Sequence, residues 1–210
     1  MIKDLQQLIE NECRFCNPPD KERILYETKN FYVMLSLGPI VEGYILIVSK
    51  EHFDCCGALP DRMGKEFDML YQKAKEILKE TYGAVLCYEH GRAGSCLGTG
   101  DGSKHCFHAH MHLIPTSINL SEIVEKDIIS ENLQNLVDFR KLYKSAHKPY
   151  LYIDDGAKKI FQIEGEIRRQ YLRFKTAEAI KQEHLWDWVT YQNWEFINSA
   201  KITLSEKFNK

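Results

Sequence analysis

The chain has 210 residues, of which 44% are hydrophobic and 28% charged, and its formal net charge is -2. This composition is typical of a globular protein with a sizeable core, and it argues against binding nucleic acid mainly through bulk positive charge. The longest apolar run, near residues 44–48, is far too short to cross a bilayer, and the N-terminal stretch lacks a signal-peptide core. We therefore expect a cytoplasmic protein without a membrane partner.

The cysteines indicate reduced thiols rather than a disulfide framework. Their number, seven, is odd, and the pairs Cys13/Cys16 and Cys55/Cys56 are too close in sequence for a secreted framework. The Cys13-x-x-Cys16 spacing is that of half a zinc site. A redox pair and two small buried residues are the alternatives.

Short strands are predicted before the first helix. The stretches 23–28, 30–37 and 44–49 are rich in Tyr, Val and Ile, and turn residues at Gly38 and Gly43 lie between the last two. Such a meander predicts an antiparallel sheet.

An amphipathic helix is predicted to begin near Asp61 and to end at Gly83. Its apolar residues recur at spacings of three and four, as expected for a helix that packs one face on a sheet. These residues are Met63, Phe67, Leu70, Ala74, Ile77 and Leu78. A strand over 84–89 follows, and then a loop with five glycines over 91–104.

The next segment, residues 105–115, reads HCFHAHMHLIP and holds four of the eight histidines. Neighbouring side chains of a strand point to opposite faces. His108, His110 and His112 would therefore share one face, and the apolar residues between them would share the other. We expect the apolar face to pack on the core and the histidine face to look outward.

The histidine face has three chemical interpretations. A merely solvated face is the first, but three histidines in register after a glycine-rich loop argue against it. A three-histidine zinc centre with an open water position is the second. A neutral imidazole acting as nucleophile is the third. The loop adds backbone N–H donors, Ser103 and Lys104, which suit phosphate oxygens and favour phosphate chemistry.

The pattern weakens after Pro115. A helix capped by Ser130 is predicted next, then a hairpin over 149–165 that turns near Gly156, and then a helix over 166–180.

Two groups of residues in this second half invite a functional interpretation. Arg168, Arg169 and Arg173 lie on the last predicted helix and could reach distal phosphates, but a solvated basic face is the preferred interpretation. The segment 184–194 holds all three tryptophans. Anchoring of the C-terminal part to the core, or a dimer contact, is preferred there over base stacking.

The segment from His108 to Ile114 resembles the signature of the histidine triad (HIT) family, His-x-His-x-His followed by two apolar residues, and Pro115 also fits. The resemblance extends back to the CxxC pair through the order of strands, helix, strand and glycine loop. It implies an α+β, HIT-like fold: an antiparallel sheet of about five strands with a long amphipathic helix, plus a mainly helical C-terminal extension. We expect a HIT-like catalytic core over 1–116 and an extension packed on it over 117–210.

The resemblance implies a nucleotide hydrolase or nucleotidyltransferase that acts at an α-phosphate. His110 would be the nucleophile and carry a nucleotidyl-histidine intermediate, while His112 would hold the phosphate. The implied partner is a small-molecule nucleotide, such as a dinucleoside polyphosphate or a phosphoramidate, and no organic cofactor is expected. Further residues expected at the nucleotide or its phosphates are His90, Ser103, Lys104 and His105. Homodimers are common in the family, although the extension could cover that surface.

Two positions depart from the family pattern. Lys104 stands four residues before the first triad histidine, where a polar residue, often Gln, is usual, and Glu89 stands where an Asn is usual. The identity of the nucleophile survives these changes. They motivate an alternative function, a nucleotide-binding or RNA-processing factor that keeps the fold without turnover.

The resemblance also implies a structural zinc ion. Zinc-carrying members complete the CxxC pair with a histidine after the second hairpin strand and with the first triad histidine. The implied ligands are Cys13, Cys16, His52 and His108, a closed Cys2His2 set. Cys55 and Cys56 are rival ligands near His52. A zinc hydrolase that uses all three triad histidines is the second alternative function.

Overall fold

The structure, a computed structural model, describes residues 13–94 and 107–209. Its strands are β1 (Ile24–Glu27), β2 (Phe31–Leu35), β3 (Ile45–Ser49), β4 (Leu86–Gly91), β5 (His110–Ile114), β6 (Glu131–Leu133), β7 (Tyr150–Asp154) and β8 (Lys158–Gln162). Its α-helices are α2 (Asp61–Tyr82), α3 (Leu120–Val124), α4 (Leu136–Ala146), α5 (Tyr171–Ala179) and α6 (Trp194–Phe208). Short 3-10 helices span Lys21–Arg23, Cys56–Ala58 and Glu183–Trp186.

These strands form one sheet in the order β1-β2-β3-β5-β4-β7-β8-β6, and every pairing is antiparallel. The predicted α+β class with an antiparallel sheet is confirmed. The described residues contain eight strands rather than about five, because the C-terminal half extends the sheet past β4. There β7 pairs with β4 from Cys87, opposite Asp154, to Gly91, opposite Tyr150. The edge of β4 that five strands would leave unpaired is thereby covered.

The strands and the helix predicted for the first half are confirmed, whereas residues 95–104 of the predicted glycine loop lie outside the described residues. Strands β1, β2 and β3 form the meander, and α2 ends one residue before Gly83. Gly83 has a φ of 88°, and its N–H donates to the carbonyl of Lys79 at 2.8 Å. A left-handed residue of this kind closes a helix, and glycine takes that conformation without a side-chain penalty.

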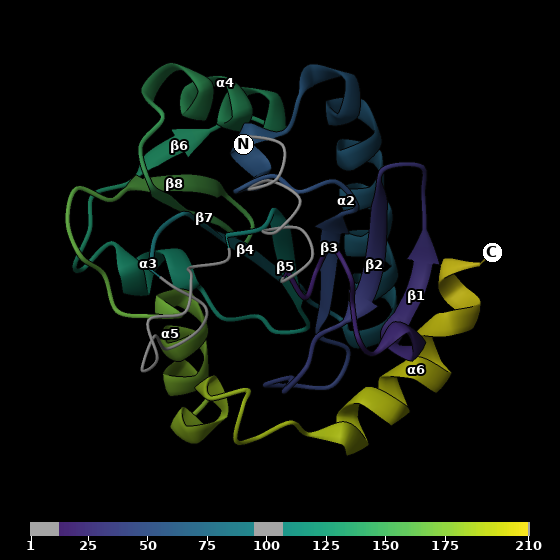
Figure 1. Cartoon of the computed structure of the whole chain (residues 1–210). Helices are drawn as coiled ribbons and strands as arrows, with labels where there is room; N and C mark the ends of the chain where they lie inside the picture. Colours follow the sequence, from purple (N-terminus) through teal and green to yellow (C-terminus); the bar gives the residue numbers. More distant parts are fainter. Residues whose placement is uncertain (1–12, 95–106, 210) are drawn as a thin grey trace.

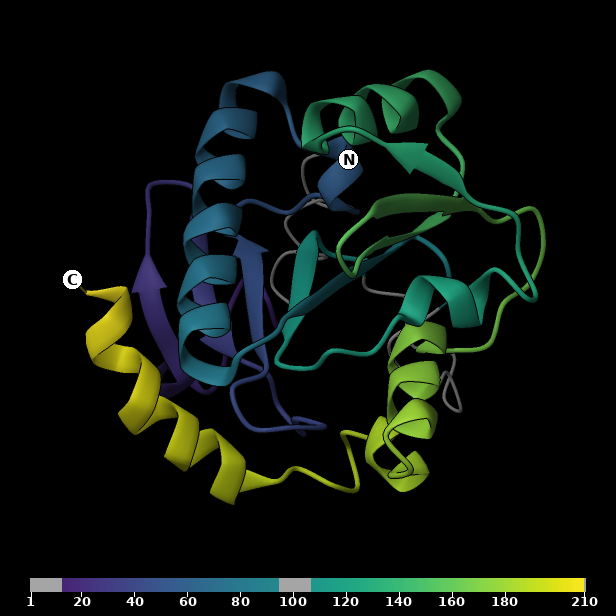
Figure 2. The ribbon, with the colours of Figure 1, turned by 180° about the vertical axis from the view of Figure 1, so that it is seen from behind.

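Helices cover both faces of the sheet. Apolar side chains of α2, α4 and α6 share one core cluster with the sheet, and those of α3 and α5 share a second cluster. Figure 2 shows α2 in front of the first strands, with α6 along the edge of the sheet, whereas α3 and α5 lie together in Figure 1. Because both faces are covered, every residue of β2, β3 and β7 is buried.

The second half differs from its prediction in part. The hairpin is confirmed as β7 and β8. Ser130 does not cap a helix: β6 follows it, and α4 starts only after Asn135, whose side chain accepts the N–H of Asp138 at 2.9 Å. Gln170 has a φ of 52°, so α5 begins at Tyr171 and not near residue 166. The C-terminal half is helical but also carries three strands, and its separation as a domain from residue 117 onward stays a prediction.

Within the described residues, none of the helices combines the length and the apolar character that crossing a bilayer would require.

Candidate active site and metal cluster

The histidine strand β5 lies inside the sheet, between β3 and β4. The predicted alternation is confirmed, because Ala109, Met111 and Leu113 belong to the core cluster under α2, while His110 and His112 lie on the opposite face. His108 precedes the first residue of β5 and continues the same register.

The prediction that the histidine face looks outward is wrong. His108 is only 3% and His110 only 6% exposed, and His112 is partly buried. Two segments distant in sequence cover this face, the turn at residues 13–16 and helix α5. The ring of Phe15 from that turn lies 4.7 Å from the His110 ring, centroid to centroid.

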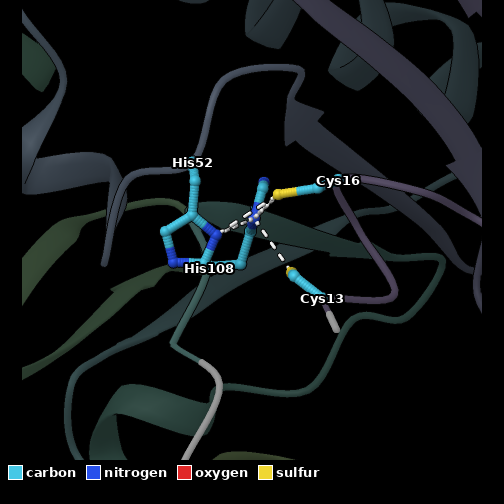
Figure 3. A group of neighbouring side chains, drawn as sticks. All are labelled: Cys13, Cys16, His52 and His108. Carbon is cyan, nitrogen blue, oxygen red and sulfur yellow. Dashed lines mark hydrogen bonds between the residues drawn. The ribbon is translucent and has the colours of Figure 1, made fainter. Parts of the chain in front are cut away.

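Cys13, Cys16, His52 and His108 form a cluster at one end of the histidine strand. Their ligand atoms all lie within 4.8 Å of one another. The sulfur of Cys13 is 3.4 Å from Nδ1 of His108, and the sulfur of Cys16 is 3.3 Å from Nδ1 of His52. Figure 3 shows the four side chains converging from three parts of the chain. The structure thus brings together the four residues expected as metal ligands.

The spacing of these atoms fits a tetrahedral zinc ion. With bonds of about 2.3 Å to sulfur and about 2.0 Å to nitrogen, tetrahedral geometry places a sulfur and a nitrogen about 3.5 Å apart and two nitrogens about 3.3 Å apart. A third of the four sulfur–nitrogen distances, from Cys16 to Nδ1 of His108, is 3.7 Å, and the two Nδ1 atoms of His52 and His108 are 3.3 Å apart.

The other ring nitrogen of His108 supports this role. Nε2 lies 2.8 Å from the carbonyl oxygen of Ser49, which can only accept, so Nε2 carries the proton. In the neutral ring Nδ1 then keeps its lone pair toward the cluster. A hydrogen bond of this kind typically orients histidine metal ligands.

Cys55 and Cys56 are not part of the cluster, so the rival ligand set is wrong. Both residues are buried in the core, and burial raises the pKa of the Cys55 thiol to about 12. Their neighbour there is the buried carboxylate of Glu89, which accepts the N–H of Cys56 at 2.6 Å and the hydroxyl of Tyr150 at 2.6 Å. Glu89 therefore holds the core together and does not line the pocket of the histidine strand.

His110 presents one ring nitrogen to a pocket. Its Nδ1–H donates to the carbonyl oxygen of His108 at 2.6 Å. Nε2 has no hydrogen-bond partner among residues 13–94 and 107–209, and the side chain lines the pocket. Burial lowers the pKa of His110 to about 4, which keeps the imidazole neutral. A neutral ring with one nitrogen held and the other open is arranged as a nucleophile.

Two tyrosine hydroxyls, linked by a hydrogen bond, hold the ring of His112. Its Nδ1 hydrogen-bonds to the Tyr44 hydroxyl at 2.7 Å, which bonds in turn to the Tyr88 hydroxyl at 2.8 Å. Burial, with a smaller contribution from the charge of His110, lowers the pKa of His112 well below its usual range. The rings of His110 and His112 lie edge to face, with centroids 4.7 Å apart.

His90 also reaches this pocket, from strand β4. Its Nε2 accepts the backbone N–H of Leu172 in the first turn of α5 at 3.0 Å. Burial lowers the pKa of His90 to about 3, with smaller contributions from the charges of His110 and Arg173. His90 thus connects the histidine strand to the C-terminal part of the chain. Ser103, Lys104 and His105, the other residues expected at the phosphates, lie outside the described residues.

Several regions of the chain contribute residues to the pocket. The histidines come from β4 and β5, Arg14 and Phe15 come from the CxxC turn, and Arg173 comes from α5. The charged residues that line its described part are Arg14, Asp20, Arg23 and Arg173. Three cations against one carboxylate favour an anionic ligand. Sequence reasoning missed Phe15 and Tyr44 because no local pattern marks their contacts with the histidines.

The three triad imidazoles do not converge on one point. Among the described residues, the group of side chains that could hold a metal ion includes His108 but neither His110 nor His112. The interpretation as a three-histidine zinc centre therefore does not fit the geometry.

Comparison with known proteins relates the part of the chain that carries the triad to a family. Residues 18–118 match the family model described as HIT domain. An uncharacterized HIT-like protein of Borreliella burgdorferi is 29% identical over 111 residues, 50% of this chain and 75% of that protein. One of Methanocaldococcus jannaschii is 24% identical over 115 residues, 54% of this chain and 83% of that protein. Among solved structures, yeast Ap4A phosphorylase Apa2 in complex with AMP aligns with a TM-score of 0.45 at 15% identity, covering 85% of this chain and 79% of that one.

The domain match covers the strands that carry the pocket, the helix α2 and all three triad histidines. Residues 18–118, just under half of the chain, are therefore a HIT domain, the domain of the histidine triad superfamily.

Proposed function

We propose that this protein hydrolyses or transfers a nucleotidyl group at an α-phosphate, through a covalent intermediate on His110. The observation that carries the proposal is the state of this imidazole: the His108 carbonyl holds Nδ1–H, and Nε2 opens into a pocket rich in cations. The substrate class is a small nucleotide conjugate, such as a dinucleoside polyphosphate or a phosphoramidate.

In the first step, the Nε2 lone pair of His110 forms a bond to the α-phosphorus. The bond from phosphorus to the leaving group breaks, and the leaving group departs with that electron pair and takes up a proton. The ring then bears phosphorus on Nε2 and hydrogen on Nδ1, and it is cationic. The His108 carbonyl, 2.6 Å from Nδ1, stabilises this charge. In the second step the oxygen of water, or of another acceptor, bonds to the same phosphorus. The bond from phosphorus to Nε2 breaks, its electron pair returns to the His110 ring, and the proton of the acceptor passes to solvent.

We further propose that Cys13, Cys16, His52 and His108 hold a zinc ion. Four protein ligands close the tetrahedral shell, which is typical of structural zinc. The ion would fix His108 by its side chain, and the main-chain carbonyl of the same residue holds the nucleophile. It would also fix the turn that carries Phe15 over the His110 ring.

A substrate panel with the wild type and His110→Ala tests the reaction. The panel contains dinucleoside polyphosphates, nucleoside phosphoramidates, nucleotide sugars and capped RNA fragments, followed by product analysis and by mass spectrometry of acid-labile protein adducts. We expect turnover and an adduct in the wild type, and a loss of at least about 10⁴-fold in the variant, because the covalent route is gone.

The matched control is His184→Ala, which removes an exposed histidine outside the pocket and should leave the turnover unchanged. Nucleotide binding without consumption of any substrate would overturn the catalytic proposal and make the triad a recognition surface.

A further inference from the structure

The described residues contain three buried arginines, and they differ in their partners. Arg140 is held by both carboxylate oxygens of Asp68, at 2.6 and 2.9 Å. Arg23 lies 3.5 Å from the carboxylate of Asp20. Arg173 is 4% exposed and has no carboxylate partner anywhere in residues 13–94 and 107–209. A buried cation without an anion is costly, so an unpaired one indicates a missing partner.

Main-chain carbonyls use only part of the Arg173 guanidinium. Nε donates to the carbonyl of Trp186 at 2.8 Å, and Nη2 donates to the carbonyls of Leu185, at 2.8 Å, and Gly38. A guanidinium has five N–H donors. The two donors on Nη1 have no partner among the described residues. Carbonyl dipoles hold the side chain in place, but they do not neutralise its charge.

The position of Arg173 identifies where the missing anion would lie. The side chain lines the pocket together with His90, His110 and His112. Its guanidinium carbon lies 5.5 Å from the centre of the Tyr44 ring, and the Tyr44 hydroxyl holds His112. The free Nη1 donors of Arg173 therefore belong to the same pocket into which Nε2 of His110 opens.

We propose that Arg173 binds a phosphate group of the nucleotide in this pocket. Arg173 lies on α5, outside the HIT domain at residues 18–118, so the C-terminal part of the chain completes the binding site. The ligand is a phosphate oxygen because the free Nη1 offers two N–H donors on a positively charged guanidinium, and charge-assisted bonds of this kind suit phosphate. This inference deepens the proposed function and rests on it for the identity of the ligand.

The structure corrects the preferred interpretation of the three arginines. Arg168 is exposed, and its guanidinium carbon lies 3.7 Å from the centre of the Phe174 ring and 4.4 Å from that of the Trp186 ring. Arg169 precedes the helix. Arg173 lies inside the protein rather than on a solvated basic face.

The test compares the binding of AMP with that of adenosine, and of GMP with that of guanosine, by calorimetry at fixed ionic strength. The proteins are the wild type, Arg173→Lys, Arg173→Met and the control Lys175→Met, which removes a positive charge from the same helix outside the pocket. We expect the wild type and the control to prefer the monophosphate by at least about tenfold, as a charge-assisted contact provides. Arg173→Met should lose that preference, and Arg173→Lys should keep part of it.

An unchanged preference for the monophosphate in a folded Arg173→Met variant would overturn the proposal. Because Arg173 also holds three carbonyls, a second measurement uses the wild type alone, a crystal structure with AMP. A phosphate oxygen within about 3.2 Å of Nη1 supports the proposal, and its absence from that position overturns it. Neither measurement requires turnover, so a failure of the catalytic proposal is separable from a failure of this one.

Discussion

The row of triad histidines, from His108 to His112, carries sites of opposite character at its two ends: a closed end at His108 and an open end formed by His110 and His112. At His108, the sulfur and nitrogen atoms of four side chains face one another within 4.8 Å, and the second ring nitrogen is held by Ser49. At His110, one nitrogen is held and the other opens into a pocket. The alternation of side chains along a strand places the three histidines on one face. The partner of each ring nitrogen then determines what each imidazole can do. The closed end suits a structural metal, and the open end suits chemistry.

Phe15 connects the two ends. It stands between the two cysteines of the CxxC turn, and its ring lies 5.5 Å from His108 and 4.7 Å from His110, centroid to centroid. The hydroxyl of Tyr32 holds the turn by donating to the Phe15 carbonyl at 2.7 Å. A metal ion bound by the cysteines would therefore also position a wall of the pocket.

Removal of the proposed metal ion tests this comparison with the largest expected effect. We expect a strong chelator, or Cys16→Ser, to lower the free energy of unfolding by at least about 3 kcal/mol, because binding to the folded state alone stabilises it. For a chain of this size that loss lowers the Tm by about 6–12 °C. Differential scanning calorimetry with parallel determination of zinc content measures it.

A variant that retains a metal donor provides the control for this change. Cys16→His replaces a sulfur ligand by a nitrogen ligand and should recover part of the lost stability. Loss of turnover on chelation with an unchanged Tm would place the metal in the chemistry and contradict the division between a closed and an open end.

The closed end was the easier one to predict from the sequence. The CxxC spacing and the register of His108 are local patterns, and the family resemblance supplied His52. The signature likewise marked His110, whose Nδ1 is held by the backbone carbonyl of His108, two residues earlier in the same motif. The first strands and α2 were equally accessible, because their periodicity is strong and lies within each segment.

The open end depends on contacts that no local pattern records. Arg173 looked like part of a solvated basic face because its sequence neighbours are basic, and its burial follows from α5 docking on β4 through the bond from Leu172 to His90. The extension of the sheet beyond β4 was missed for the same reason. The hairpin was visible in the sequence, but its pairing with the edge of β4 is a tertiary contact.

The pH dependence of the unfolding free energy tests whether the histidines of the open end are shielded from water. The unfolded chain protonates His90 near pH 6.5, whereas burial lowers the pKa in the folded protein to about 3. Between these values the unfolded state binds more protons, so stability is full above pH 6.5 and is lost as the pH falls. At pH 5 the loss from His90 is about 1 to 2 kcal/mol, the lower value allowing for the part of the ring that water reaches.

His90→Gln isolates this contribution. Glutamine can still accept the N–H of Leu172 but does not titrate, so the difference in stability between wild type and variant should shift by that amount between pH 7 and pH 5. Urea denaturation at a series of pH values measures it. Parallel curves for the two proteins would mean that His90 is charged or fully solvated in the folded state.

The smallest expected effect concerns the hydroxyl chain beneath His112. Tyr44→Phe removes the hydroxyl that lies 2.7 Å from Nδ1 of His112 and leaves the ring free to change its tautomer and orientation. We expect kcat/KM to fall about tenfold, with most of the loss in kcat, because the bond positions His112 and does not itself touch the reacting phosphorus. The ¹⁵N chemical shifts of the His112 ring report the tautomer directly and should change with the rate. Tyr82→Phe is the matched control, because its hydroxyl donates to Glu42 at 3.3 Å and lines no part of the pocket. A tenfold loss in Tyr44→Phe without any change in the His112 shifts would assign the effect to packing around Tyr44 and remove His112 from the positioned groups of the open end.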